Sequence, residues 1–251
     1  MFTVGVIPAR YGSKRLEGKA LKDILGHPMV WWVYKRVCKI KKLGVVYVAT
    51  DDERIEKVCK SAGIPAIMTA TSHLTAANRL WEVSEKIAAD FYVQINGDEP
   101  LIDTYAVEAV IPDFVPDDAF GTNVITEIKS PTELMDVSNI KVAFDCDLNA
   151  LYMSRTPIPA AFKSIDFHYY KHVGIIGYNK KMLDFYNDST PGRFETIEGI
   201  DTLRFLDYGK KLKFVYVKDC HSLSVDTEKD LELVRKRMME EYGNGKRFEI
   251  A

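Results

Sequence analysis

The segment FTVGVIPARYGSKRLEGK covers residues 2–19 and joins an apolar run to a polar loop. The run Phe2–Ile7 predicts a buried strand, and Pro8 is expected to end it. The loop holds two glycines, a serine and four cations: Arg10, Lys14, Arg15 and Lys19. Because open α/β sheets bind ligands at the carboxyl ends of their strands, this loop indicates a site for an anion such as a polyphosphate.

The loop matches neither of the two common phosphate-binding motifs. It is neither G-x-x-x-x-G-K-[ST] nor G-x-G-x-x-G, so neither a P-loop ATPase nor a Rossmann dehydrogenase is indicated. A solvated basic loop is the simplest alternative. The position of the loop directly after the first predicted strand favours a ligand site.

The composition is that of an ordinary water-soluble globular protein. The 251 residues include 47% hydrophobic and 28% charged residues, with a formal net charge of -2, which argues against a nucleic-acid partner. No apolar stretch approaches the roughly 20 residues that span a bilayer, so we expect no membrane insertion and a cytoplasmic location. The four cysteines are scattered without a C-x-x-C pair, which suggests neither a zinc site nor a disulfide framework.

Strand and helix patterns alternate through the first hundred residues. This alternation predicts repeated βαβ units and a mainly parallel sheet. The expected strands are Phe2–Ile7, Val45–Thr50, Ala66–Met68 and Phe91–Asn96. The expected helices lie around Met29–Ile40, Glu53–Ala62 and Ala77–Ile87.

The second half is less regular, and we expect it to carry a β-rich insertion at about residues 125–185. Strands are expected at Ile140–Phe144, Ala150–Ser154, His172–Tyr178 and Lys213–Val217, the first two as a hairpin. Helices are expected around Lys180–Asn187, Glu195–Asp207 and Glu228–Glu241. The sequence thus predicts an α/β fold in one domain, residues 1–251: a mainly parallel, Rossmann-like layer with an inserted region that contacts substrate or pairs subunits.

Short motifs with a shared order and spacing resemble the 3-deoxy-manno-octulosonate (Kdo) cytidylyltransferase family, over about residues 2 to 240. The matching segments are 8–16 with 18–19, 48–51, 68–69, 73, 79–80, 97–100, 150–152 with 154–155, 157–159, 172–174, 225–227 and 230–231. The resemblance implies a nucleotidyltransferase fold and a reaction in which a 2-keto sugar acid attacks the α-phosphorus of CTP and releases pyrophosphate. It also implies a homodimer and a product used in lipopolysaccharide or capsule assembly.

The resemblance assigns the nucleotide and metal roles residue by residue. Arg10, Lys19 and Asp98 would be catalytic, because phosphoryl transfer depends on positioning and charge neutralisation. The nucleotide contacts would be Ala9, Arg10, Gly12, Ser13, Arg15, Lys19 and His73. Asp98 and Asp226 would bind Mg²⁺, which prefers hard oxygen ligands. Taken singly, Asp98 could be a turn residue and Asp226 a helix cap, and Glu99 is a weaker metal candidate.

A sugar acid carries a carboxylate, so its pocket needs cations or amide donors. The residues that match or adjoin the family's sugar pocket are Arg79, Asn96, Arg155, His172, Tyr178 and Glu195. Isolated histidines are more often structural, so His172 has two comparable interpretations.

The chain departs from the family pattern in the segments that contact base and sugar. Residues 74–79 are LTAANR where the family usually has QSGTER, Asn96 stands for Gln, and Asp201-Thr202 stands for Glu-Gln. Such changes retarget specificity, so the acceptor could be Kdo, an amino-Kdo, a nonulosonic acid or a phosphonate. The sequence is also compatible with a different nucleotide base and with a catalytically inactive nucleotide-binding homologue.

Overall fold

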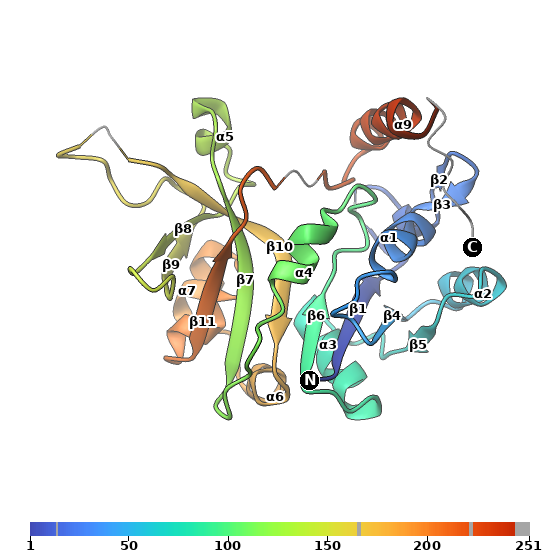
Figure 1. The fold of residues 1–251 in the computed structure, drawn as a ribbon, viewed down its shortest axis with the longest axis horizontal. Coiled ribbons are helices and arrows are strands. Elements are labelled where there is room, and N and C mark those ends of the chain that lie inside the picture. Colours follow the sequence, from blue (N-terminus) through green and yellow to red (C-terminus); the bar gives the residue numbers. More distant parts are fainter. Residues whose placement is uncertain (14, 165–166, 221–222, 244–251) are drawn as a thin grey trace.

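A nine-stranded sheet forms the centre of the molecule (Figure 1). The computed structural model describes residues 1–13, 15–164, 167–220 and 223–243, so Lys14 of the basic loop lies outside the described residues. The main path of the sheet has the order β11-β7-β10-β6-β1-β4-β5. These strands are β1 (Thr3–Ala9), β4 (Val45–Thr50), β5 (Ala66–Met68), β6 (Phe91–Gln94), β7 (Phe120–Glu127), β10 (Tyr170–Tyr178) and β11 (Lys211–Tyr216).

The predicted parallel layer is confirmed in the first half of the chain. β1 pairs in parallel with β4 and β6, and β4 pairs in parallel with β5. β10 is antiparallel to both β6 and β7, whereas β11 is parallel to β7. The carboxyl ends of β1, β4, β5 and β6 therefore share one edge of the sheet.

Helices cover both faces of the sheet. One buried cluster contains residues of α1 (Met29–Val37), α2 (Glu53–Ser61), α4 (Thr104–Ala109) and α9 (Glu228–Gly243). The other cluster contains residues of α3 (Ala76–Lys86), α6 (Lys180–Asp188) and α8 (Leu203–Asp207). The remaining elements are η1 (Lys19–Leu21), β2 (Asp23–Ile24), β3 (His27–Pro28), α5 (Pro131–Met135), β8 (Lys141–Phe144), β9 (Ala150–Ser154) and α7 (Arg193–Glu198). No described helix is long and apolar enough to cross a bilayer.

The first strand is longer than predicted. β1 continues through Pro8 to Ala9, which pair with Ala49 and Thr50 of β4. The carbonyl of Val6 faces β6, where it accepts from Ile95. Strand residues alternate in direction, so the backbone of Pro8, two residues on, points toward β6 as well. The pairing of β1 with β6 ends at Val6, and the N–H that proline lacks therefore removes no hydrogen bond between the two strands.

The helix predicted over Glu195–Asp207 is wrong as a single element. Gly199 ends α7 in the left-handed conformation, with φ 62°, and its N–H donates to the Glu195 carbonyl. α8 begins only at Leu203. Glycine adopts this conformation at little cost, so a helix commonly stops there.

The region 125–185 contributes to the main sheet as well as to a separate hairpin. β7 and β10 are strands of the central path, and β7 was not predicted. β8 and β9 form the predicted antiparallel hairpin, which joins the sheet through β10. Beyond β9, the chain extends away from the body before it returns as β10 (Figure 1).

Candidate functional site

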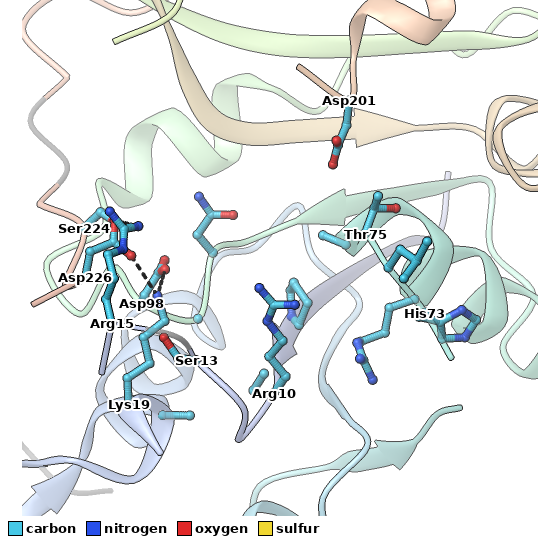
Figure 2. A pocket seen from close by; sticks show the side chains of 18 residues that line it. Arg10, Ser13, Arg15, Lys19, His73, Thr75, Asp98, Asp201, Ser224 and Asp226 are labelled. Atoms are coloured by element: carbon cyan, nitrogen blue, oxygen red, sulfur yellow. Dashed lines mark hydrogen bonds and ion pairs between the residues drawn. The ribbon is translucent and has the colours of Figure 1, made fainter. Parts of the chain in front are cut away.

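A cavity of ≈ 480 Å³ lies at the sheet edge where β1 and β6 end (Figure 2). Its walls come from the loops after β1, β5 and β6 and from the segments that precede α8 and α9. The polar side chains of the lining are Arg10, Ser13, Arg15, Lys19, His73, Thr75, Arg79, Asn96, Asp98, Asp201, Ser224 and Asp226. The basic loop therefore opens on a cavity, as the position of the loop predicted.

A cluster of charges closes one end of the cavity. The Lys19 ammonium contacts the Asp98 carboxylate and lies 3.2 Å from Oδ1 of Asp226. Arg15 Nη2 lies 2.9 Å from Oδ2 of Asp226. The backbone joins the same segments, because Val225 N–H donates to the Asp98 carbonyl at 2.8 Å. The two aspartates, predicted from distant turns, thus converge on a single ammonium group.

This pair of carboxylates has the donor chemistry of a magnesium site. Mg²⁺ binds hard oxygen ligands and commonly uses one or two carboxylates together with phosphate oxygens. Among the residues that the structure describes, no group of three or more His, Cys, Asp or Glu side chains could hold a metal ion. Asp98 and Asp226 would therefore hold such an ion together with oxygens of a bound polyphosphate.

Arg10 carries a positive charge that forms no ion pair with any acid in the described part of the chain. Its side chain points into the cavity, and no described acid forms an ion pair with it (Figure 2). The loop around it is closed by Gly18 N–H, which donates to the Tyr11 carbonyl at 2.9 Å. The Arg54 guanidinium lies 3.3 Å from the centre of the Tyr11 ring. Arg10 is therefore available for an anionic ligand on a loop that is held in place.

The other predicted nucleotide contacts are mostly in the lining. Ala9, Ser13, Arg15 and His73 border the cavity with Arg10 and Lys19, whereas Gly12 is exposed outside the lining. This placement agrees with the predicted loop without testing any single contact. These roles stay predictions.

His73 is fixed by a carboxylate that the sequence did not single out. Its Nε2 lies 2.5 Å from Oε2 of Glu82. Burial opposes ionisation of Glu82, but hydrogen bonds from Lys86, the Ala70 N–H and His73 outweigh it and lower the pKa of Glu82 to about 2. Glu82 therefore stays ionised and holds the His73 ring against the cavity wall.

Arg79 lines the cavity, but a protein acid compensates its charge. Its Nη2 lies 2.7 Å from Oδ2 of Asp51, and its Nη1 donates to the Thr69 hydroxyl. The Arg79 side chain is only 4% exposed. This arginine therefore stabilises the wall, and a substrate contact by Arg79 stays a prediction.

Asn96 and Asp201 also line the cavity. Asn96 donates from Nδ2 to Oε1 of Glu99 at 2.8 Å. Asp201 faces Thr75 across the cavity (Figure 2). None of the described groups donates a hydrogen bond to the Asp201 carboxylate. Desolvation by the surrounding protein, followed by the nearby charge of Glu195, raises its pKa.

Two other predicted substrate contacts, Arg155 and Glu195, are engaged elsewhere. Arg155 donates to the carbonyls of Val137, Glu198 and Gly199. Glu195 is buried in a two-bond ion pair with Arg204, both bonds at 2.7 Å. Both residues lie outside the cavity lining. Their contacts are those of structural residues, and substrate binding by them stays a prediction.

His172 and Tyr178 lie behind the cavity, on β10. His172 Nδ1 lies 2.7 Å from Oδ1 of Asn123, and burial lowers the pKa of His172 to about 4. The Asn123 amide nitrogen donates to the Val173 and Ile175 carbonyls, so its oxygen faces His172, and Nδ1 of the neutral imidazole carries the proton. Tyr178 is 2% exposed and its hydroxyl donates to Gln94 at 3.5 Å. Both support the wall, and direct substrate binding stays a prediction.

Several lining or supporting residues were not predicted: Thr75, Glu82, Asp201 and Ser224. Thr75 was visible as a helix cap, because its hydroxyl accepts from Asn78 N–H at the start of α3. Ser224 directly precedes the matched segment 225–227. Asp201 lies in one of the segments where the chain departs from the family pattern, whereas Glu82 carries no local signal and is brought to His73 by the fold.

Comparisons with known proteins agree with this geometry. The family model described as Cytidylyltransferase matches residues 4–212. The chain is 38% identical over 236 residues to 3-deoxy-manno-octulosonate cytidylyltransferase of Escherichia coli, covering 94% of this chain and 96% of that protein. It is 35% identical to 8-amino-3,8-dideoxy-manno-octulosonate cytidylyltransferase of Shewanella halifaxensis, covering 93% and 97%.

A solved structure resembles the whole fold. CMP:2-keto-3-deoxy-manno-octonic acid synthetase complexed with CTP superimposes with a TM-score of 0.90 at 37% identity, covering 96% of this chain and 100% of that chain. The inositol-1-phosphate CTP transferase of T. maritima has a TM-score of 0.67 at 14% identity and supports the fold alone. The predicted α/β nucleotidyltransferase fold is thereby confirmed.

Proposed function

Because the chain belongs to the cytidylyltransferase family, we propose that it transfers CMP from CTP to a 2-keto sugar acid of the Kdo class. The anomeric hydroxyl of the acceptor attacks the α-phosphorus, a P–O bond forms, and the bond to the pyrophosphate leaving group breaks. The convergence of Lys19, Asp98 and Asp226 beside the free charge of Arg10 is the observation that carries this proposal.

Different residues of the cavity contact the phosphates, the metal ion and the base. Arg10 and Lys19 bind and neutralise phosphate oxygens, since fixed cations stabilise the charge that develops during phosphoryl transfer. Asp98 and Asp226 hold a Mg²⁺ ion, which supplies further charge neutralisation when it is bound. The His73 ring, held by Glu82, borders the space for the base.

The acceptor is assigned to the end of the cavity at Asn96 and Asp201. The Asn96 amide can bond a carboxylate or hydroxyl of the sugar acid, and the Asp201 carboxylate can accept from a hydroxyl. An ammonium group would also pair with Asp201, which no described side chain neutralises. An amino sugar acid is therefore the second candidate, and relatives named for 8-amino-3,8-dideoxy-manno-octulosonate are about as similar to this chain as those named for Kdo itself.

A homodimer is part of the proposal. Large apolar side chains are exposed around the hairpin and its extension: Met135 at 67%, Val137 at 63%, Leu151 at 60%, Phe162 at 92% and Ile197 at 70%. Exposed apolar surface of this kind commonly marks an interface. Light scattering coupled to size exclusion should give twice the mass of the 28.5 kDa chain. We further propose that the enzyme is cytoplasmic and that its product is used in lipopolysaccharide or capsule assembly.

A pyrophosphate-release assay tests the activity. Purified protein is mixed with CTP, Mg²⁺ and one acceptor at a time: Kdo, 8-amino-Kdo, a nonulosonic acid and a phosphonate. We expect turnover with Kdo or 8-amino-Kdo and a CMP-sugar product by mass spectrometry. Turnover only with the phosphonate, or none with any acid, would contradict the proposed acceptor class. Replacing CTP with UTP, ATP or GTP tests the base.

A further inference from the structure

A chain of hydrogen bonds runs behind the acceptor end of the cavity. The Tyr178 hydroxyl donates to Oε1 of Gln94 at 3.5 Å, and Nε2 of Gln94 donates to Oδ1 of Asn96 at 3.4 Å. Nδ2 of Asn96 donates to Oε1 of Glu99 at 2.8 Å. Three of these side chains are almost fully buried, at 2% exposure for Tyr178, 8% for Gln94 and 3% for Glu99. Of the four, Asn96 lines the cavity.

The Tyr178 hydroxyl and the contact with Glu99 determine which groups donate and which accept in this series of hydrogen bonds. Burial raises the pKa of Tyr178 well above its ordinary value, so its hydroxyl keeps its proton and donates. At Asn96, the amide nitrogen is the atom that faces Glu99, because Nδ2 donates to Oε1 of Glu99. Gln94 and Asn96 could each be reversed by a half-turn of the amide, but reversal of Asn96 would set its oxygen against the Glu99 oxygen. The Asn96 amide therefore has one favoured orientation.

The Asn96 amide packs against the backbone of Gly174, where a larger residue would leave it no room. A Cβ on Gly174 would lie 2.0 Å from Nδ2 of Asn96. Gly174 lies in an irregularity of β10, where the pairing with β7 shifts register between His172 and Ile176. The Asn123 amide holds this irregularity, because its nitrogen donates to the Val173 and Ile175 carbonyls at 2.8 and 3.1 Å.

We propose that Glu99 is a positioning residue that sets the orientation of the Asn96 amide and thereby the selectivity for the acceptor, with Gly174 providing the space. This inference rests on the proposed function for its kinetic consequence. Glu99 lies outside the cavity lining and acts through Asn96. The adjacent acid, Asp98, contacts the Lys19 ammonium, so the two neighbouring carboxylates have different partners.

A double-mutant cycle separates this role from a general effect on folding. The variants are Glu99→Gln, Asn96→Ala and both together, with Glu228→Gln as control, because the Glu228 side chain is 61% exposed on α9. Glu99→Gln conserves shape but permits either amide orientation. We expect the KM for the acceptor to rise on the order of tenfold, as for one lost hydrogen bond, while the KM for CTP and the melting temperature stay unchanged.

The double variant gives the decisive comparison. If Glu99 acts through Asn96, Asn96→Ala alone and the double variant have the same acceptor KM, because the second change removes nothing further. The proposal would be overturned if the rise in acceptor KM in the double variant equalled the product of the two single rises, or if Glu99→Gln raised the KM for CTP as much as the KM for the acceptor. Gly174→Ala provides an independent perturbation of the same amide and should also raise the acceptor KM.

A spectroscopic readout makes the inference testable without turnover. The side-chain NH₂ resonances of Asn96, identified by their loss in Asn96→Ala, should shift in Glu99→Gln and stay in place in Glu228→Gln. Unchanged resonances in Glu99→Gln would overturn the positioning role. Absence of turnover by the wild-type protein with every sugar acid would instead count against the proposed function, and the NMR result would still decide the role of Glu99.

Discussion

The two ends of the cavity are built from different kinds of contact. At the phosphate end, Arg15, Lys19, Asp98 and Asp226 are ion-paired to one another. At the acceptor end, the Asn96 amide is held by neutral and acidic neighbours behind the wall. Charge at the first end can serve any nucleoside triphosphate, whereas shape and hydrogen-bond direction at the second can distinguish between acids. In the proposed function, chemistry and selectivity are therefore carried by separate groups, and we expect that each can be altered alone.

The largest expected effect is at the phosphate end. Asp98→Asn removes one of the two carboxylates proposed to hold Mg²⁺ and weakens the hold on Lys19. We expect kcat to fall by about 10²–10³-fold, the range seen when one preorganised electrostatic group is lost. Pyrophosphate release at saturating CTP and acceptor measures this. The control is Asp113→Asn, whose side chain is 97% exposed. A kcat close to that of the wild type would remove Asp98 from the proposed metal site.

Arg10 and Arg79 can be compared directly, because Arg79 forms an ion pair with Asp51 whereas Arg10 forms none with any described acid. Arg10→Ala should raise the KM for CTP by about 10–100-fold, as for the loss of charge-assisted hydrogen bonds, with an unchanged melting temperature. Arg79→Ala leaves Asp51 without its partner and should lower the free energy of unfolding by about 3 kcal/mol. Thermal denaturation and CTP titration on both variants distinguish the two outcomes. Equal loss of stability in both would contradict the view that Arg10 is reserved for ligand.

Asp201 tests the acceptor end. Asp201→Asn should raise the KM for the acceptor on the order of tenfold and leave the KM for CTP unchanged, because one acceptor group for a hydroxyl or ammonium is lost. Since the pKa of Asp201 is raised, its carboxylate becomes protonated at a higher pH than usual. The wild-type acceptor KM should therefore rise as the pH falls through that pKa, and the variant should lack this dependence. The same pH profile in both proteins would exclude Asp201 from acceptor binding.

Lys19, Asp98 and Asp226 were singled out by the resemblance to the family, and the structure places all three in the cavity lining. They lie in strand-end loops and before a helix, and such positions meet at one edge of a parallel sheet. Isolated charges such as Arg155 and Glu195 carry no such information. The partner of Glu195 is Arg204, nine residues away across the break at Gly199, which helical periodicity does not reveal.

The same limit applies to the fold. The strand β5 is an apolar run and β4 is apolar up to its last residue, Thr50, and both were predicted with their observed bounds. β7 was missed because three buried polar residues interrupt its apolar pattern: Thr122, Asn123 and Thr126. Their partners lie far away in sequence, for example the Val110 carbonyl that accepts from the Thr122 hydroxyl at 2.6 Å. Only the folded chain shows that these polar groups are satisfied.

Replacing His172 is expected to have the smallest effect on activity. It should instead change how the stability of the protein depends on pH. Burial lowers its pKa to about 4 from an ordinary value of 6.5. Above pH 6.5 both the folded and the unfolded chain hold a neutral imidazole. Between pH 6.5 and 4 the unfolded chain binds a proton that the folded chain excludes, so stability falls as the pH is lowered. The loss should reach about 3 kcal/mol below pH 4, at about 1.4 kcal/mol per pH unit.

His172→Asn isolates this contribution, because the asparagine amide can still donate to Asn123 from near the position of Nδ1 but does not titrate. Urea unfolding of both proteins from pH 7 to pH 4 should show the wild type losing more stability than the variant, and the difference between the two curves cancels the titration of the other acids. Imidazole NMR resonances give the pKa of His172 directly. A value near 6.5 would show that the ring is solvated in the folded protein, and the β10 wall would then be open to water behind the acceptor end.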